Sequence, residues 1–322
     1  MSRRRRLSAR STHAHDPAHR LAAHEALGTA LYQIGDYAAA RWHFEQGTAL
    51  IDPTTQWALA LRHGSAPGPH LLSYAANALW CLGYPTQAMQ RCQEALALAQ
   101  ELAHPYSLAR PQFFAAWLHY RRRDVSAVHA QAKALLTLAT TQGFPLYVGV
   151  GTCMRGWALA MQGQGEVGLA QLRQGLAAVV AAGQVLAQGP ALVLLAEVAG
   201  HAGQVAEGLR LLTEARMVLE SNGQGDMLPE AWWLQGALLL QQDAVDGAQA
   251  ESCFQQALAI ARRQQAKSWE LRAAMSLSRL WQQQGKRNAA RGLLAPVYGW
   301  FTEGFDTADL QEAQALLEEL RA

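Results

Sequence analysis

The sequence predicts an all-α fold, a right-handed superhelical solenoid of about seven helical hairpins followed by a capping helix. Two observations predict it: a repeat of about 40 residues, and apolar residues spaced at the helical period with no strand-like alternation. One position in the first helix of each repeat is always small, which lets a neighbouring helix backbone approach closely. These repeat-packing residues are Gly28, Ala76, Ala116, Gly156, Ala196, Gly236 and Ser278, at spacings of 48, 40, 40, 40, 40 and 42 residues.

Each repeat is expected to contain two amphipathic helices. In the unit that begins near Leu71, apolar residues from Leu79 to Leu98 recur at steps of three and four. Several first helices end in a glycine, which supplies the left-handed conformation that closes a helix. These glycines are Gly35, Gly83, Gly203 and Gly285. A second small position follows at Ala40, Ala88, Gly168, Gly208, Ala250 and Ala290, and the third unit offers either Ala127 or Val128.

Three parts follow one another along the chain. Residues 1–20 form a basic tail that is expected to be disordered, residues 21–302 form the repeat array, and residues 303–322 form the capping helix. The stretch "GSAPGP" from Gly64 is interpreted as a linker that explains the one long spacing.

The capping helix is predicted to run from Thr307 to Leu320, with Asp306 or Thr307 as its N-cap. Its acidic residues suit the polar outer face of a terminal cap. These are Glu312, Glu318 and Glu319.

The basic tail has several interpretations. The first 20 residues hold six arginines and one acid, so the remaining chain is mildly acidic although the formal net charge is +2. The tail could touch nucleic acid or anionic lipid, or grip a metal through His13, His15 and His19. A solvated leader is favoured, because clustered charge without apolar residues buries nothing. The acidic body does not suggest a nucleic-acid binder.

Composition excludes several other classes. Half of the residues are apolar and 16% are charged, which does not fit a disordered chain. The four cysteines show no C-x-x-C pair and are expected to be buried thiols in a reducing cytoplasm: Cys81, Cys92, Cys153 and Cys253. No signal peptide is evident. The most apolar region, 176–198, is broken by glycine and proline, which predicts two buried helices rather than a membrane span.

The segment Gly163-Gln-Gly165-Glu-Val-Gly168 matches the G-x-G-x-x-G string of dinucleotide-binding loops. In register with the other units, Gly163 is the glycine that ends the first helix and Gly168 is the small packing position, so only Gly165 is extra. A dinucleotide site needs a strand before the motif, whereas an amphipathic helix is predicted here. The segment is therefore interpreted as a repeat turn, and no cofactor is expected.

The first unit resembles a tetratricopeptide repeat in Leu27-Gly28, Gly35-Asp36-Tyr37, Ala40, Phe44 and Asp52-Pro53. The longer period is similar to that of repeats in bacterial signalling ATPases and maltose-activator-type transcription regulators. From about His24 onward, phrases such as "LSYAANALWCLGYPTQA" and "LLAPVYGWFTEGFDTADLQEAQALLEEL" resemble the C-terminal repeat region of multidomain bacterial proteins. Those proteins join a class III adenylate/guanylate cyclase or kinase domain to a predicted signalling ATPase.

This resemblance implies the regulatory portion of such proteins alone. The chain has neither the phosphate-binding string G-x-x-x-x-G-K-[ST] nor the metal-binding aspartates of a cyclase, so no catalytic residue and no metal ligand is carried over.

By analogy with tetratricopeptide geometry, the first helices line a concave groove that is the usual docking surface. The candidate partner-binding residues are Tyr32, Asn77, Trp80, Trp117, Tyr120, Arg121, Trp157, Glu197, Trp233 and Arg279. Trp, Tyr and Arg dominate binding hot spots, but large aromatic residues also pack between helices. Arg121–Arg123 could clamp an anionic partner, although a solvated turn is the favoured interpretation.

The expected function is that of a non-catalytic, cytoplasmic protein–protein interaction scaffold in bacterial signal transduction. It would bind a protein or peptide segment, such as part of a signalling ATPase or cyclase, and neither nucleic acid nor membrane. The alternative is a regulatory module that senses a small molecule inside the superhelix.

Overall fold

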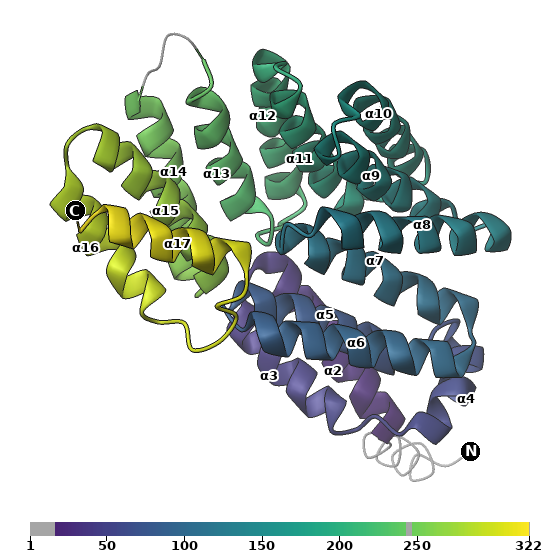
Figure 1. The fold of residues 1–322 in the computed structure, drawn as a ribbon. Coiled ribbons are helices and arrows are strands. Elements are labelled where there is room, and N and C mark those ends of the chain that lie inside the picture. The colour runs from purple at the N-terminus through teal and green to yellow at the C-terminus, as the bar shows by residue number, and fades with distance from the viewer. Residues whose placement is uncertain (1–16, 243–246, 322) are drawn as a thin grey trace.

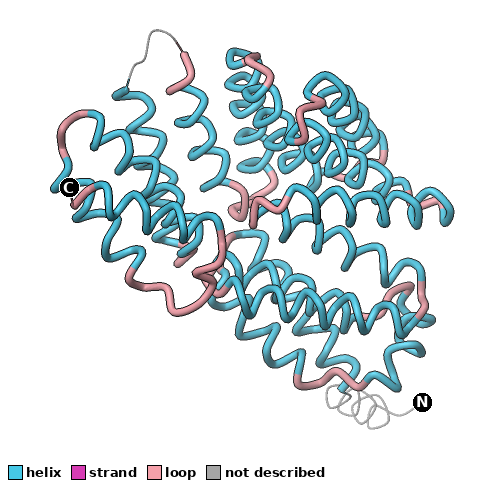
Figure 2. Tube along the Cα trace, in the orientation of Figure 1, coloured by secondary structure: helices cyan, strands magenta, loops and turns pink. Residues whose placement is uncertain are grey.

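The computed structural model describes residues 17–242 and 247–321, and within these ranges it contains sixteen helices and no strand (Figures 1 and 2). Fourteen of the described helices form seven successive hairpins. The hairpins are α2 (Pro17–Ile34) with α3 (Tyr37–Thr48), α5 (Pro67–Cys81) with α6 (Pro85–Leu102), α7 (Pro105–Arg121) with α8 (Val125–Gln142), α9 (Pro145–Met161) with α10 (Gly165–Ala181), α11 (Val185–His201) with α12 (Val205–Ser221), α13 (Leu228–Leu239) with α14 (Gly247–Arg263), and α15 (Lys267–Gln283) with α16 (Arg287–Tyr298). The predicted all-α repeat solenoid is confirmed.

Two further helices complete the described fold, α4 (Pro53–His63) and the terminal α17 (Ala308–Glu319). Helix α4 corrects the interpretation of the 48-residue spacing as a linker. It begins where Asp52 accepts a hydrogen bond from the Thr54 N–H at 3.0 Å and Pro53 occupies the first turn. Helix α5 starts within "GSAPGP" itself, at Pro67. Helix α4 belongs to none of the seven hairpins, so the repeat pattern does not predict it, and it leaves large apolar side chains such as Trp57 exposed.

The array begins four residues before the expected boundary at residue 21. Helix α2 starts at Pro17, and proline suits a first helical turn because its missing N–H would have no partner there. The remainder of the predicted tail, with His13 and His15 of the suggested metal grip, lies outside the described residues.

All seven repeat-packing residues are buried, and so are the six residues of the second small position. In the third unit Val128 is fully buried whereas Ala127 is half-buried, so Val128 occupies the packing register. The closest approach is between α9 and α10. A Cβ atom on Gly156 would lie 2.9 Å from the Gly168 carbonyl oxygen, and one on Gly168 would lie 2.6 Å from that of Gly156. These two backbones therefore pack against each other without side chains between them.

The G-x-G-x-x-G segment is a repeat turn, as predicted. Gly163 has φ +89°, the left-handed conformation that ends α9, and a Cβ atom on Gly165 would meet nothing within 4 Å. The segment follows helix α9 and not a strand, so it lacks the geometry of a dinucleotide-binding loop.

The apolar residues fill the interior of the solenoid. All four cysteines are free and buried. The most apolar region of the sequence is divided between α10, which ends at Ala181, and α11, which begins at Val185. Among the helices of the described residues, none combines the length and apolar character needed to cross a bilayer.

The two ends of the array meet, so the solenoid closes on itself (Figure 1). The Gly225 N–H, in the loop between α12 and α13, donates to the Gln33 carbonyl at 2.7 Å. The Ser268 hydroxyl on α15 donates to the Trp80 carbonyl on α5 at 2.5 Å. The rings of Trp80 and Trp269 also meet, with centroids 5.2 Å apart. Hairpins far apart in sequence thus share one interior.

A carboxylate from the C-terminal loop caps helix α6. Tyr84, the N-cap residue, makes no side-chain capping bond. Instead Glu303 Oε1 accepts the backbone N–H groups of Thr86 and Gln87 at 3.0 and 3.1 Å, and Glu303 Oε2 accepts from the Gln87 amide at 2.9 Å. Because the first turn of a helix has free N–H groups, this contact stabilises α6. It also ties the C-terminal loop to α6.

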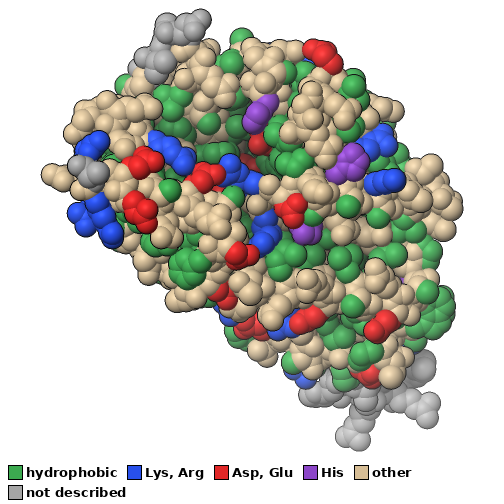
Figure 3. All heavy atoms as spheres, viewed as in Figure 1, with side chains coloured by type: hydrophobic (Ala, Val, Ile, Leu, Met, Phe, Trp, Pro, Cys, Tyr) green, Lys and Arg blue, Asp and Glu red, His purple; other side chains and the backbone are tan. Residues whose placement is uncertain are grey.

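Helix α17 contributes charge to the closure through Glu312, one of the acids expected on its polar outer face. Glu312 accepts from Arg123 at 2.6 Å and from Arg279 at 3.1 Å. Arg123 also lies 3.4 Å from Asp309. The turn after α7 is therefore paired with the last helix instead of being simply solvated, and acidic and basic side chains gather over this region in Figure 3.

Substitution of Gly156 by Ala is expected to lower the free energy of unfolding by about 1–3 kcal/mol, because the added Cβ would press on backbone atoms that cannot rotate away. Urea denaturation followed by circular dichroism measures this. Gly165→Ala is the matched control, since its Cβ enters open space. Equal losses in the two variants would show that close backbone approach is not the reason.

Substitution of Glu303 by Ala is expected to expose the start of α6, at a cost of about 1 kcal/mol for the lost cap. Hydrogen exchange at the Thr86 and Gln87 amides should then become faster. Asp124→Ala, which removes the local cap of α8, serves as a control that should leave those two amides unchanged. Unchanged exchange in Glu303→Ala would contradict the closure contact.

Candidate binding cavity in the interior

The ten candidate partner-binding residues lie on the first helices of the hairpins, as their spacing predicts. Seven of them are buried, Glu197 and Trp233 are half-buried, and Arg279 is exposed. The structure brings eight into two adjoining polar clusters in the interior. The other two lie apart: the Trp233 indole donates to Ser276 at 2.9 Å, and Arg279 pairs with Glu312. Their role toward a partner stays a prediction.

The first cluster surrounds the guanidinium of Arg121. This side chain is fully buried, and its Nη1 donates to the Tyr32 hydroxyl at 2.7 Å and to Asn77 Oδ1 at 3.2 Å. The rings of Tyr32, Trp80 and Trp117 lie 5.5–5.9 Å from its central carbon, within reach of cation–π attraction. Its Nε and Nη2 atoms have no hydrogen-bond partner among the described residues. Three successive hairpins thus meet on one buried cation.

Arg272 extends this cluster toward the C-terminal end. Its Nη2 donates to the Arg121 carbonyl and its Nε pairs with Asp309 at 2.8 Å. The Trp80 and Trp269 rings lie 5.1 and 5.0 Å from its central carbon. The polar interior therefore continues from α7 through α15 to α17.

In the second cluster, the carboxylates of Glu197 and Glu230 both contact the hydroxyl of Tyr120. Tyr120 is in hydrogen-bond contact with Glu230 and lies 3.0 Å from Glu197 Oε2, and the Trp157 indole donates to the same Glu197 oxygen at 2.8 Å. Tyr120 has a single hydroxyl proton, so it can bond both acids fully only when one of them is protonated. Burial raises the pKa of Glu230 to about 7, while the Tyr120 hydrogen bond and Arg121 oppose that shift.

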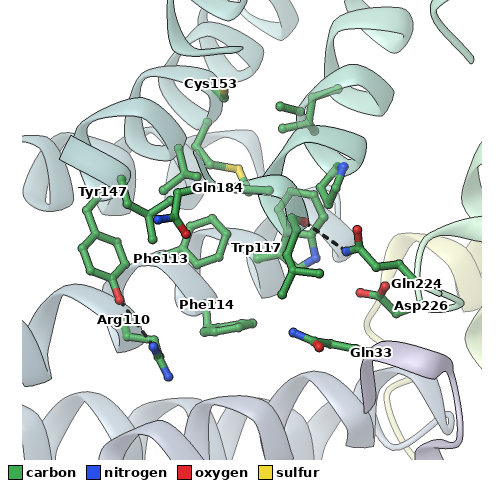
Figure 4. Close-up of a pocket in the computed structure, with 18 of the residues that line it drawn as sticks. Gln33, Arg110, Phe113, Phe114, Trp117, Tyr147, Cys153, Gln184, Gln224 and Asp226 are labelled. Atoms are coloured by element: carbon green, nitrogen blue, oxygen red, sulfur yellow. Dashed lines mark hydrogen bonds between the residues drawn. The ribbon is translucent and has the colours of Figure 1, made fainter. Parts of the chain in front are cut away.

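Beside these clusters lies a cavity of about 230 Å³. It is lined by α2, α5, α7, α9 and α11, by Gln184 before α11 and by the loop between α12 and α13 (Figure 4). Most of its wall is aromatic or aliphatic, and three glutamines from different elements add polar groups. The lining residues used below are Phe113, Phe114, Trp117, Ala187, Gln33, Gln184, Gln224, Arg110, Tyr147 and Asp226.

Two of the described lining residues are charged, and they lie on opposite sides of the cavity in Figure 4. Arg110 is already engaged: it donates to the Tyr147 hydroxyl at 3.4 Å and to His70 Nδ1 at 3.1 Å, and lies 3.9 Å from Glu25. Asp226 is 8% exposed, and its Oδ1 has no hydrogen-bond partner among the described residues.

Burial raises the pKa of Asp226 to about 6, and the positive charge of Arg121 together with backbone N–H groups counteracts that shift. The carboxylate is consequently still mostly ionised at neutral pH. An apolar cavity with one unsatisfied charged group is an arrangement suited to binding, since a ligand can bury its body and satisfy that group.

Sequence reasoning found the aromatic and cationic inner surface but missed Asp226, Glu230, Arg110 and Arg272. Asp226 and Glu230 occur in an irregular unit, and neither belongs to the repeat pattern. Arg110 and Arg272 lie on the first helices of their hairpins, two helical turns before the candidate residues Trp117 and Arg279. A search that included inward positions in those earlier turns would have found them.

The stability of the Glu230→Gln variant relative to the native chain is expected to depend on pH. Burial raises the Glu230 pKa from 4.5 to about 7, so the folded state holds this proton more tightly than the unfolded state. Its contribution to stability therefore falls as pH rises from about 4.5 to 7, by about 3 kcal/mol in total. Glu230→Gln should gain stability relative to the native chain across that window, measured by urea denaturation at several pH values. A pH-independent difference would contradict this.

Neither a protein-family model nor a curated protein matches the sequence. Solved structures do share the fold. A Rap protein complexed with competence and sporulation factor superposes with TM-score 0.61 at 13% identity, over 94% of this chain and 80% of that one. Aspartyl phosphate phosphatase F from Bacillus subtilis gives 0.54 at 10% identity, over 95% and 71%. The apo form of RapI gives 0.53 at 10% identity, over 93% and 99%. At these identities the likeness establishes a tetratricopeptide-like helical-repeat fold.

Proposed function

We propose that this chain is a non-catalytic regulatory module of bacterial signal transduction that binds a short segment of a protein or peptide in its interior cavity. The observation that carries the proposal is the cavity itself, whose apolar wall is assembled from five inner helices and the loop between α12 and α13. A pocket of this kind, with few polar groups in an aromatic surround, is typical of a binding site.

The walls are preorganised for binding. The loop that carries Asp226 is fixed by backbone hydrogen bonds to Gln33, and the Gln224 amide donates to the Leu186 carbonyl at 3.0 Å. Groups already held in place lose little conformational freedom when a ligand docks, so more of the contact energy is expressed as affinity.

The fold gives the proposal a precedent. The Rap structure described above is a complex with competence and sporulation factor, so one protein of this fold has been crystallised with a bound factor. The proposed partner of this chain is a segment of a signalling ATPase or a cyclase, as the resemblance of its repeat phrases to that group of proteins implies.

A second candidate is a module that senses a small molecule. The size of the cavity is compatible with it, because about 230 Å³ suits a small metabolite as well as a few side chains. Specific thermal stabilisation by a metabolite, in the absence of a peptide that binds, would support this candidate.

Filling the cavity should abolish binding. Peptides selected by display against the native chain are expected to bind Ala187→Trp about tenfold or more weakly, because the indole would occupy space the ligand needs. Isothermal titration with the selected peptides measures the effect. Ala130→Trp, on the exposed face of α8, is the matched control and should bind like the native chain.

Unchanged affinity of Ala187→Trp for every selected peptide would place binding elsewhere and refute the cavity as the site. Turnover of a nucleotide by the purified chain would refute a non-catalytic role.

A further inference from the structure

We propose that the occupant of the cavity carries a positively charged nitrogen group on an apolar or aromatic body, and that this group pairs with Asp226. The inference rests on the proposed function, since it names the chemistry of the ligand for the same cavity.

The position of Asp226 is set by its backbone. Its carbonyl accepts from the Tyr37 hydroxyl at 3.1 Å, and its N–H donates to the Gln33 carbonyl at 3.2 Å. The neighbouring Gly225 packs so closely on α2 that a Cβ atom there would collide with the Ile34 carbonyl oxygen. The first hairpin therefore holds the Asp226 backbone in place while the side chain lines the cavity between Gln33 and Gln224 (Figure 4).

The charge of Asp226 has no direct partner in the described part of the chain. No Lys, Arg or His there forms an ion pair with it within 4 Å. Arg121 is the cation whose field acts on it most, but that guanidinium directs its hydrogen bonds to Tyr32 and Asn77. A buried carboxylate without a hydrogen-bonding cation is costly, and a ligand that supplies one gains a charge-assisted hydrogen bond.

Other features of the cavity favour a cation over an anion. Arg110, the basic residue of the lining, already contacts Tyr147, His70 and Glu25. The carboxylate of Glu25 offsets its positive charge. The aromatic faces of Phe113, Phe114 and Trp117 bind apolar groups and also attract positive charge. An anionic ligand would meet a carboxylate that no cation contacts directly, and would be repelled by it.

The proposal is tested with two pairs of probes, each made of a cationic molecule and a neutral polar counterpart that has the same aromatic group. Phenethylamine and 2-phenylethanol represent a free small amine and its neutral counterpart. N-acetyl-Phe-Lys-amide and N-acetyl-Phe-Gln-amide represent a basic side chain within a peptide and its neutral counterpart. Dissociation constants come from NMR chemical-shift titration of the native chain, Asp226→Asn and Glu101→Gln, the last being an exposed carboxylate used as control.

The cationic member of at least one pair is expected to bind the native chain roughly 10- to 100-fold more tightly than its neutral counterpart, the range of one charge-assisted hydrogen bond. Asp226→Asn should remove that preference and Glu101→Gln should retain it. Preference in the first pair alone identifies a small amine, and preference in the second alone identifies a basic peptide side chain.

Equal or weaker binding of both cationic probes by the native chain overturns the proposal, and so does a preference that survives in Asp226→Asn. The native-chain comparison is decisive even if Asp226→Asn folds poorly. If the cationic preference is absent but the neutral probes bind, and Ala187→Trp abolishes their binding, the ligand class is wrong but the cavity remains the binding site. If the affinity of the display-selected peptides is also unchanged in Ala187→Trp, the proposed function itself fails.

Discussion

The structure depends above all on the buried guanidinium of Arg121. A charge taken out of water is tolerated only when its surroundings compensate it. Here the compensation comes from separate hairpins: the hydroxyl of Tyr32, the amide of Asn77 and three aromatic rings, with the acids Asp226 and Glu230 acting at longer range. A simple stack of hairpins would leave this side chain on an open concave surface. Its burial requires the array to curve until the two ends meet.

Closure changes what the inner surface can do. In an open solenoid the first helices present a long groove, but here the C-terminal helices fill much of it through Ser268, Arg272 and Asp309. What stays open is the cavity beside Trp117. Helical repeats contact mainly their neighbours, so contacts such as Glu303 with the start of α6 are additional to the repeat and turn a one-dimensional array into a single cooperative body.

The sequence predicted the features that recur in every repeat, and it missed the features that occur only once. The small residues Gly156 and Gly168 follow the period, and so does the turn glycine Gly163, because each hairpin faces the same packing problem. Helix α4, the cap from Glu303 and the pairing of Glu312 with Arg123 occur once each. The two contacts join residues that are close only after the solenoid has closed, and α4 lies outside the hairpin repeat, so no periodic pattern records any of the three. Asp226 was missed for the same reason, because its position beside the cavity is set by hydrogen bonds to Tyr37 and Gln33 of the first hairpin.

The place of the cavity gives binding a route to regulation. One wall belongs to α2, and the wall beside it is the loop before α13, which is joined to α2 by hydrogen bonds to Gln33 and by the close packing of Gly225. A ligand that touches both walls binds the closed state better than an open one, and by that difference in affinity it shifts the equilibrium toward closure. The ion pairs of Arg123 with Asp309 and Glu312 join the turn after α7 to α17 in another part of the same closure. Any opening of the seam where the ends of the array meet would therefore link occupancy of the cavity to the exposure of these charged side chains.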